Sequence, residues 1–323
     1  MRARLAIRGR VGSPKVGLFE LNSHRVVHIP NCRVHHPLIN RVASVVRRVL
    51  VETDMTSYSD RAHLGLARYL QVVVERSSQS AQVVLVANCE TPEPVAACLD
   101  LVRERLGSDL HSLWFNGNCT TSNSILGPEF HKWCGPESVV EHFGGAAVHY
   151  PPGAFGQNNL ELAEKIVANV GAQIPYGTRV AEFYAGVGAI GLSVLPRLSG
   201  IMMNEVSAHS LRGLELGLAQ LDAADRLKIS VVPGEAGAAR LSAHAAQIVI
   251  ADPPRKGLDP VLIEHLLEHP PERFLYVSCG LDSLRNDAAR LTSTGWLRLT
   301  GLSAFNLMPY TEHVETVACF ERA

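Results

Sequence analysis

Short apolar runs alternate with segments of helical periodicity in the C-terminal half of the chain. Apolar runs of about four to eight residues are typical of buried strands, and apolar residues three or four positions apart are typical of helices. Six such strands alternate with helices and a seventh closes the series, which predicts a doubly wound α/β sheet. The segments that we interpret as strands are TRVAEFYAG, GIMMNE, KISVVPG, QIVIA, RFLYVS, WLRLTGLSAF and HVETVACFER.

The N-terminal part has a different pattern, with strands first and few helices. KVGLFEL and RVVHI flank the turn residues Asn22 and Ser23, which predicts a hairpin. Leu38–Val51 has helical spacing. Two further strands (HLGLARYLQVVVER and QVVLVAN), a helix (PVAACLDLVRERL) and a strand (SLWFNGN) follow. This order predicts a mixed α+β domain.

A loop-rich stretch from Asn118 to Gly153 separates the two patterns and ends in HYPPGAFGQNN. Either Asn158 or Asn159 then caps a helix, because asparagine is a favoured residue at the start of helices. We therefore expect a smaller α+β domain over residues 1–150 and the α/β domain over residues 151–323.

The composition is that of a soluble globular protein, with 46% hydrophobic and 19% charged residues. A length of 323 residues is enough for two domains. The N-terminus is basic but lacks the apolar core of a signal peptide, and we find no uninterrupted apolar run of spanning length. We expect a cytoplasmic monomer that does not enter a membrane.

The formal net charge of −1 hides an excess of positive charge at the N-terminus. Residues 1–50 contain ten Lys or Arg residues and one acid, Glu20. Arg41, Arg47 and Arg48 lie on or near one side of the predicted helix. A basic arm on an acidic body is a reason to consider nucleic acid as a partner. A solvated basic face without a partner would have the same sequence.

The cysteines and histidines do not have the spacing of metal ligands. None of the seven cysteines belongs to a CxxC pair, so neither a zinc site nor a cluster site is indicated. His35 and His36 are adjacent, but no partner follows at ligand spacing, and loop histidines are the simpler interpretation. We therefore expect no metal.

Two reactive side chains follow neighbouring predicted strands. Asp252 follows QIVIA and Cys279 follows RFLYVS, and their separation of 27 positions fits one β-α-β unit. The carboxyl ends of parallel strands border one crevice, so we expect this carboxylate and this thiol side by side. Taken alone, Cys279 could be a buried small hydrophobe, and Asp252 could cap the turn made by the two following prolines.

A glycine-rich run, FYAGVGAIG, follows the first strand of the second domain and opens a helix. Gly186 and Gly188 would let the backbone turn tightly and approach a ligand. Glu205 ends the next strand, 19 residues after Gly186, close to the ~20 expected for an acid that binds ribose hydroxyls. Glu235 ends the third strand, where the adenine of a nucleoside cofactor would lie. NAD and S-adenosylmethionine both fit these features.

The last two predicted strands have no full helix between them, which favours a Rossmann-like class I methyltransferase sheet over a dehydrogenase sheet. FGQNN, FYAGVG, DPPRKG, YVSCG and MPYTEHVET together resemble the RNA uracil-5-methyltransferases, which make 5-methyluridine in tRNA and ribosomal RNA. The resemblance runs from about Arg2 to the C-terminus and is strongest from Phe155 onward. NCRVHHPLIN and LWFNGN also resemble the central domain of that family.

This resemblance implies roles for individual residues. Cys279 would attack carbon 6 of a flipped uracil, carbon 5 would take the methyl group of S-adenosylmethionine, and Glu315 would remove the carbon-5 proton. Cys279 must then be at least partly ionised. Without the resemblance, Glu315 would be interpreted as an exposed strand acid. The residues expected to contact the cofactor or the base are Gln157, Tyr184, Glu205 and Asp252, and Arg255 would steady the loop or a phosphate.

The chain also departs from the pattern of that family. Gly280 replaces the asparagine of the usual SCN, Asn306 replaces an acid before MPYT, and Ala189 stands where an asparagine is common. From this sequence we expect the N-terminal barrel of many members to be missing. Of the four cysteines that hold an iron–sulfur cluster in some members only Cys32 matches, so we expect no cluster. A non-catalytic RNA-binding or chaperone-like protein with the same fold is the alternative hypothesis, and a dehydrogenase is a third.

Overall fold

The computed structural model describes residues 1–307, 311 and 313–323, and the chain forms two compact units within them. The first unit contains Met1–Glu141 and Pro151–Gly153, and the second contains His142–Tyr150 and Ala154–Ala323. This division differs from a boundary after residue 150. The reason is that β9 (Ala146–Tyr150) packs against α4 (Ala189–Val194) and α5 (Ala208–Ala219) of the second unit.

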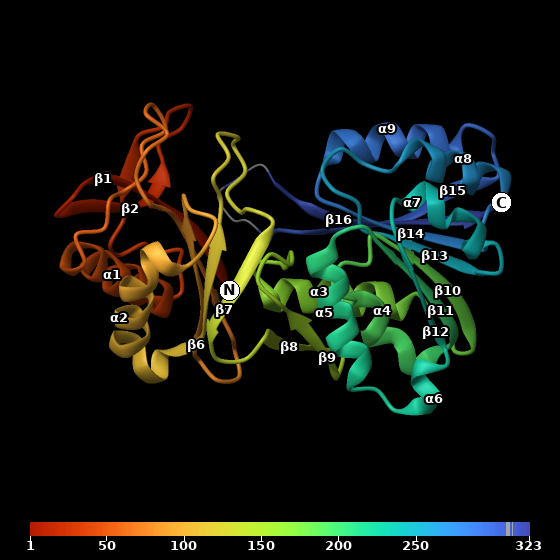
Figure 1. Ribbon diagram of the computed structural model, residues 1–323. Helices are drawn as coiled ribbons and strands as arrows, with labels where there is room; N and C mark the ends of the chain where they lie inside the picture. Colours follow the sequence, from red (N-terminus) through yellow and green to blue (C-terminus); the bar gives the residue numbers. More distant parts are fainter. Residues whose placement is uncertain (308–310, 312) are drawn as a thin grey trace. The chain divides into compact units, whose positions relative to one another are not determined.

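The first unit is a seven-stranded sheet with two helices on one face (Figure 1). The strand order is β3-β2-β1-β4-β5-β6-β7, and all neighbours are antiparallel except β5 and β6. The two helices pack against each other and against the sheet, and they bury an apolar core between the two layers. The elements are β1 (Arg2–Arg10), β2 (Ser13–Phe19), β3 (Val26–His28), α1 (Pro37–Glu52), β4 (Ala67–Val74), β5 (Ala81–Ala87), η1 (Glu93–Val95), α2 (Ala96–Leu106), η2 (Gly107–Asp109), β6 (Leu110–Gly117) and β7 (Glu129–Cys134).

The structure confirms most of the elements predicted for this unit. The predicted hairpin is the antiparallel pair β2–β3, and the predicted helix is α1, where His36 accepts a hydrogen bond from the Leu38 amide at the N-terminus. The loop-rich interpretation of residues 118–153 is wrong, because this stretch contains β7, β8 (Val139–Phe143) and β9. These strands are short, and β7 (EFHKWC) is largely polar and partly exposed. The pairing of β7 with β6 defines it, and no apolar run in the sequence marks it.

The basic segment of residues 1–50 is not a separate arm, because it forms β1, β2, β3 and α1. Several of its cations already have partners. The buried Arg8 donates two hydrogen bonds to Asp60, at 2.7 and 2.8 Å. Arg41 pairs with Asp109 at 2.8 Å, and Arg47 donates to the Pro14 carbonyl at 3.0 Å. The exposed cations of this segment that have no hydrogen bond or ion pair among the described residues are Arg10, Lys15, Arg33 and Arg48.

The second unit is a seven-stranded sheet in the order β12-β11-β10-β13-β14-β16-β15. The first five strands of this order are parallel, and β16 pairs antiparallel with both β14 and β15. This arrangement confirms the predicted class I methyltransferase sheet with its terminal antiparallel hairpin. The strands are β10 (Thr178–Phe183), β11 (Leu198–Glu205), β12 (Ile229–Pro233), β13 (Ile248–Ala251), β14 (Arg273–Ser278), β15 (Leu297–Phe305) and β16 (Glu315–Arg322).

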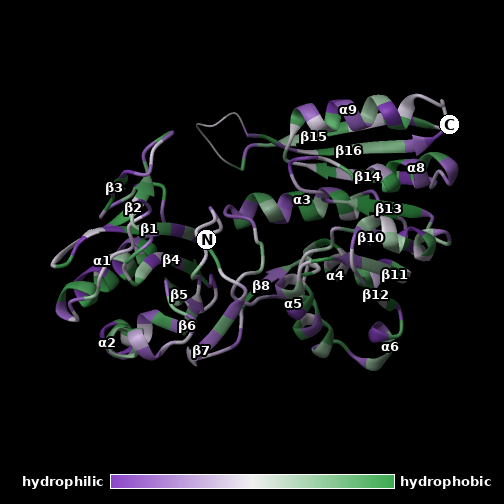
Figure 2. Ribbon diagram, turned by 45° about the horizontal axis from the view of Figure 1, so that its top comes forward, coloured by the Kyte–Doolittle hydropathy of each residue, from purple (hydrophilic) through white to green (hydrophobic). Residues whose placement is uncertain are grey.

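Helices cover both faces of this sheet (Figure 1). One face carries α3, α4 and α5, and the other carries α7, α8 and α9. Helix α9 alternates hydrophobic and hydrophilic residues, as expected for a helix with one face on a core (Figure 2). The remaining helices are α3 (Leu160–Ala172), η3 (Leu195–Arg197), α6 (Ala223–Arg226), α7 (Ala236–Ala239), η4 (Arg240–Ala243), α8 (Pro260–Glu268) and α9 (Leu281–Thr292).

The core of the second unit lies between the sheet and the helices. Every residue of β13 is buried, as are the last five of the six residues of β14. Strand order reverses between β10 and β13, and open α/β sheets bind ligands outside the carboxyl ends of the strands at such a point. No helix in the described part of the chain is long and apolar enough to span a bilayer.

Candidate active site

The glycine-rich run forms a tight loop between β10 and α4. Gly186 and Gly188 have φ angles of 59° and 85°, a left-handed conformation that glycine adopts without strain. Tyr184, which precedes them, also has a left-handed backbone conformation, with a φ of 58°. An added Cβ at Gly186 would meet no atom within 4 Å, so open space borders the loop at this point. A ligand can therefore approach the backbone here.

Glu205 is the last residue of β11 and holds this loop in place. One carboxylate oxygen, Oε2, accepts a hydrogen bond from the Gly186 amide at 2.7 Å. The other, Oε1, accepts from the amides of Val206 at 2.9 Å and Ser207 at 2.7 Å. Each oxygen has two lone pairs, so the carboxylate can still accept further hydrogen bonds. Glu205, the residue predicted to bind ribose hydroxyls, thus also holds the backbone of the glycine loop.

The neighbouring residue Asn204 was not predicted as a site residue. Its buried side-chain amide donates to the carbonyl oxygens of Val232 and Gly234, each at 2.9 Å. These bonds fasten the end of β11 to the turn after β12, where Glu235 lies exposed at the N-terminus of α7. A polar residue next to the strand-end acid was the available signal for this role.

Tyr184 connects the glycine loop to the segment DPPRKG. Its hydroxyl accepts a hydrogen bond from the amide of Asp259, at the N-terminus of α8, at 2.9 Å. Burial raises the pKa of the Tyr184 hydroxyl to about 12, and the nearby charges of Asp259 and Glu235 act in the same direction. The hydroxyl therefore stays protonated at neutral pH. Tyr184 and Glu235 lie within electrostatic reach of each other at this edge of the sheet.

The strand pairing brings Asp252, Cys279 and Glu315 to one edge of the sheet. Ala251, the last residue of β13, pairs with Tyr276 of β14, and Asp252 follows it. Cys279 follows β14, and Glu315 begins β16, which runs antiparallel beside it. The last registered pair of these two strands is Ser278 and Thr316, and the Thr316 hydroxyl donates to the Ser278 carbonyl at 3.1 Å. Cys279 and Glu315 occupy the next positions.

Burial and like charge favour the protonated forms of these three groups. Burial raises the pKa of Asp252 to about 7, and the charge of Glu315 adds to this effect. Burial also raises the pKa of Glu315. The Glu315 oxygen Oε2 is buried and has no hydrogen-bond partner among the described residues. The edge therefore holds at least one ionisable oxygen that no neighbour in the described chain satisfies.

In the protein without ligands, the surroundings of Cys279 oppose the ionisation of its thiol. Burial raises the pKa of the Cys279 thiol, and the charges of Glu315 and Asp252 raise it further. The positive charge of Arg255, in the DPPRKG loop, acts in the opposite direction on both Cys279 and Glu315. Arg255 is exposed. The structure thus contains a cation that favours the thiolate, but burial and the two carboxyl groups outweigh it.

Asp287 links Tyr276 of β14 to Leu258, the residue that follows the DPPRKG loop. The buried carboxylate of Asp287, on α9, accepts hydrogen bonds from the Tyr276 hydroxyl at 2.8 Å and from the Leu258 amide at 2.9 Å. Asp287 was not predicted, because its position in the sequence is that of an ordinary helix residue. It fixes the loop that carries Arg255 against the strand that carries Cys279.

The other predicted residues lie before α3, at the start of α4 and after β15. Gln157 is half-buried in the segment before α3, and Asn159 caps that helix by accepting from the Leu162 amide at 3.2 Å. Helix α3 packs against α4 and β16. Ala189 begins α4, and Asn306 is exposed after β15. Within the motif MPYTEHVET, residues 308–310 and 312 lie outside the described part of the chain.

Comparison with known proteins identifies the family. A sequence model of the family described as tRNA (Uracil-5-)-methyltransferase matches residues 145–323. A protein of Protochlamydia amoebophila described as an uncharacterised RNA methyltransferase is 36% identical over 327 residues, covering 99% of this chain and 85% of that protein. A similarly described protein of Caldanaerobacter subterraneus is 28% identical, covering 97% of this chain and 70% of that protein.

A solved structure shares the fold of the whole chain. It is the Pyrococcus abyssi tRNA (uracil-54, C5)-methyltransferase in complex with S-adenosyl-L-homocysteine. The TM-score is 0.80 at 22% sequence identity, over 99% of this chain and 75% of the other. The match of the family model over more than half of the chain and the 36% identity to one RNA methyltransferase agree. The chain therefore belongs to the tRNA (uracil-5-)-methyltransferase family of RNA-methylating enzymes.

Proposed function

We propose that this protein transfers a methyl group from S-adenosylmethionine to carbon 5 of a uridine in tRNA or ribosomal RNA through a covalent adduct on Cys279. The observation that carries the proposal is the position of Cys279 directly beside Glu315, at the carboxyl edge of the sheet and next to Asp252. A thiol and a base in one site are what addition to carbon 6 and proton removal from carbon 5 require.

The residues of the glycine loop fit the proposed methyl donor. Gly186 leaves open space next to the backbone, and the Glu205 carboxylate at the end of β11 can accept hydrogen bonds from ribose hydroxyls. Tyr184, Gly188 and Glu235 border the same edge of the sheet. We assign these five residues to the nucleoside part of the donor. When bound, S-adenosylmethionine supplies an electrophilic methyl group.

The chemistry on the uracil ring then uses three side chains. The Cys279 thiolate bonds to carbon 6, which makes carbon 5 nucleophilic, and carbon 5 would then take the methyl group that S-adenosylmethionine would supply, leaving S-adenosylhomocysteine. Glu315 accepts the proton of carbon 5, and the bond between carbon 6 and Cys279 breaks to regenerate the thiolate. Asp252, with its pKa raised to about 7, can keep a proton at neutral pH and donate a hydrogen bond to a carbonyl oxygen of the base. We assign Gln157 to a contact with the base, and Arg255 to a contact with a phosphate of the RNA or to the support of the loop.

The alternative hypothesis is a non-catalytic RNA-binding protein of the same fold. The pKa of Cys279 is raised, so the thiolate needed for addition is a minor species in the free protein. Binding of substrate would have to shift Cys279 from the thiol toward the thiolate form. The covalent step therefore separates the two hypotheses.

The first prediction concerns this covalent step. RNA with 5-fluorouridine at the target has no removable proton on carbon 5, so wild-type protein with S-adenosylmethionine should form a methylated adduct that survives denaturation. Cys279→Ala should form no adduct and transfer no methyl group. Glu315→Gln should accumulate adduct even with ordinary uridine, because proton removal is blocked. The measurement is denaturing electrophoresis with mass spectrometry of the adduct peptide.

The control for this experiment is Cys119→Ala, which removes an exposed free cysteine of the first unit. This variant should form the adduct as wild type does. Normal methyl transfer by Cys279→Ala would refute the assignment of the nucleophile.

The second prediction tests the electrostatic role of Arg255. Its positive charge lowers the pKa of Cys279, so Arg255→Gln should raise that pKa and slow alkylation of the thiol at pH 8. Glu315→Gln should act in the opposite direction, because the Glu315 charge raises the same pKa. A change of three- to tenfold in rate corresponds to about 0.5–1 pKa unit. The alkylation rate is read by mass spectrometry of the peptide that contains Cys279.

Lys256→Gln is the matched control, since Lys256 is the exposed cation next to Arg255 in the same loop. If Lys256→Gln slowed alkylation as much as Arg255→Gln, the effect would come from the net charge of the loop, and Arg255 would have no specific role.

The third prediction concerns the binding of the methyl donor. Glu205→Ala should weaken the binding of S-adenosylmethionine by about 1–3 kcal/mol, the cost of losing hydrogen bonds to a charged group. Part of this loss reflects the Gly186 amide that Glu205 holds. Isothermal calorimetry measures the affinity, and Glu215→Ala, an exposed acid on α5, should leave it unchanged. An unaltered affinity in Glu205→Ala would exclude this donor site.

The fourth prediction concerns the contacts with RNA. The cations without partners should contact phosphates, so replacing Arg10, Lys15, Arg33 and Arg48 with glutamine should flatten the plot of log affinity against log salt. Each lost phosphate contact should reduce the slope by about 0.7–0.9. As a control, Arg41→Gln and Arg25→Gln should change it little, because Asp109 and Glu20 already pair with these arginines. Equal slopes for the fourfold variant and wild type would mean that RNA binds elsewhere.

A further inference from the structure

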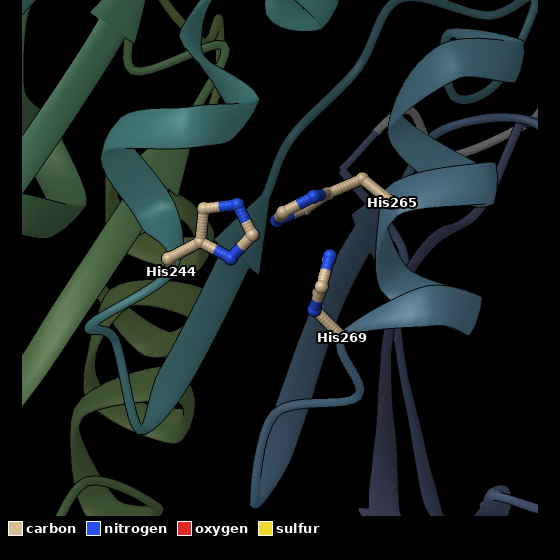
Figure 3. A group of neighbouring side chains, drawn as sticks. All are labelled: His244, His265 and His269. Carbon is tan, nitrogen blue, oxygen red and sulfur yellow. The ribbon is translucent and has the colours of Figure 1, made fainter.

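Three histidines of the second unit face one another between η4 and α8 (Figure 3). His244 follows η4, His265 lies in the last turns of α8, and His269 immediately follows that helix. The ring centroids are 4.3 Å apart for His244 and His269, 5.0 Å for His244 and His265, and 5.2 Å for His265 and His269. One ring nitrogen from each histidine lies within 4.8 Å of the others. Three nitrogen atoms therefore converge on one point.

The spacing of two of these histidines is typical of metal ligands. His265 and His269 are four residues apart at the end of one helix, so both side chains leave the same face. Two histidines at this spacing on a helix bind zinc in known motifs. His244 supplies the third nitrogen from a different segment, 21 residues earlier. The histidines were not predicted as a site because β13 and most of α8 separate His244 from the other two in the sequence.

The surroundings leave these nitrogens available to an ion. Within the described chain, no hydrogen bond or ion pair involves the three imidazole side chains. His265 is buried, whereas His244 and His269 are exposed, so an ion can reach the group from solvent.

The geometry is close to that of a zinc centre. Bonds from zinc to imidazole nitrogen are about 2.0–2.1 Å, which places nitrogens of a tetrahedral site roughly 3.4 Å apart. The histidine nitrogens lie within 4.8 Å of one another, so binding of an ion would draw them closer together, and two of the three side chains are exposed. Three histidines leave a fourth position for water, and imidazole ligands suit Zn²⁺, Cu²⁺ and Ni²⁺.

The position of the group excludes a direct part in methyl transfer. Helix α8 starts after the DPPRKG loop at the carboxyl end of β13 and leads back to the amino end of β14. His265 and His269, at the end of α8, therefore lie at the edge of the sheet opposite Cys279. His244 precedes β13 and lies at that same opposite edge.

We propose that His244, His265 and His269 bind a divalent transition metal ion, Zn²⁺ among the cellular candidates, which joins η4 to the end of α8. The ion is structural, because it links η4, which precedes β13 in the chain, to α8, which follows it. It thereby holds α8, whose first residues border the DPPRKG loop. This proposal does not depend on the function proposed above.

The test uses the full chain without an affinity tag, stripped of metal by a chelator. Calorimetry with ZnCl₂ should give one bound ion per chain, and CoCl₂ should give the visible absorption of a tetrahedral or five-coordinate nitrogen site. His244→Gln and His269→Gln should each weaken zinc binding by at least about 10–100-fold, since even a residue that only supports a ligand contributes that much. Both replaced side chains are exposed, so these variants keep the buried core of the unit.

His142→Gln, an exposed histidine of the same unit, is the matched control and should bind zinc as wild type does. Zinc should also raise the melting temperature of wild type and of His142→Gln but not that of His244→Gln, because binding to the folded state alone stabilises it. Equal affinities in wild type, His244→Gln and His269→Gln would overturn the proposal. So would the absence of a cobalt spectrum in the wild-type protein.

Discussion

The antiparallel pairing of β14 with β16 is the constraint on which the candidate active site depends. The sheet would otherwise bring together only residues that end parallel strands, such as Asp252 and Glu205. Because β16 returns between β14 and β15, its first residue, Glu315, lies beside Cys279 although 36 residues separate them in the sequence. A thiol and a carboxyl group thus share a partly buried edge, where each charge raises the free energy of the other.

This crowding has a consequence for an RNA substrate. Cys279, Glu315 and Asp252 would carry three negative charges if all were ionised, and a polyanion would be repelled. Burial instead raises all three pKa values, and the charge of Glu315 raises those of Asp252 and Cys279 further, so that the edge is less negative than its composition suggests. Arg255 adds a positive charge at the exposed side of the same edge. The conditions that lower the reactivity of the thiol in the free protein are therefore those that allow an anionic substrate to approach.

Much of this arrangement could be predicted from the sequence, because parallel strands place their ends at one edge whatever the details of packing. Apolar runs identified the strands of the second unit, and the two turn residues Asn22 and Ser23 marked a hairpin of the first. What depended on contacts between distant segments could not be predicted. The three amides bound by Glu205 and the anchoring of the DPPRKG loop by Asp287 are of this kind. Strand β7 was missed since its pairing, and not its polarity, makes it a strand.

Gly280, which replaces the usual asparagine of the family, lies against the backbone of Arg255. A Cβ at residue 280 would lie 2.6 Å from the Ser283 hydroxyl and 3.0 Å from the carbonyl oxygen of Arg255. The backbone of Arg255, in the DPPRKG loop, therefore lies close to the segment after Cys279. A side chain at residue 280 would require the Ser283 hydroxyl to turn away and the Arg255 carbonyl to move by a few tenths of an ångström. Gly280, which departs from the family pattern, thus relieves crowding beside the backbone of the cation that favours the thiolate.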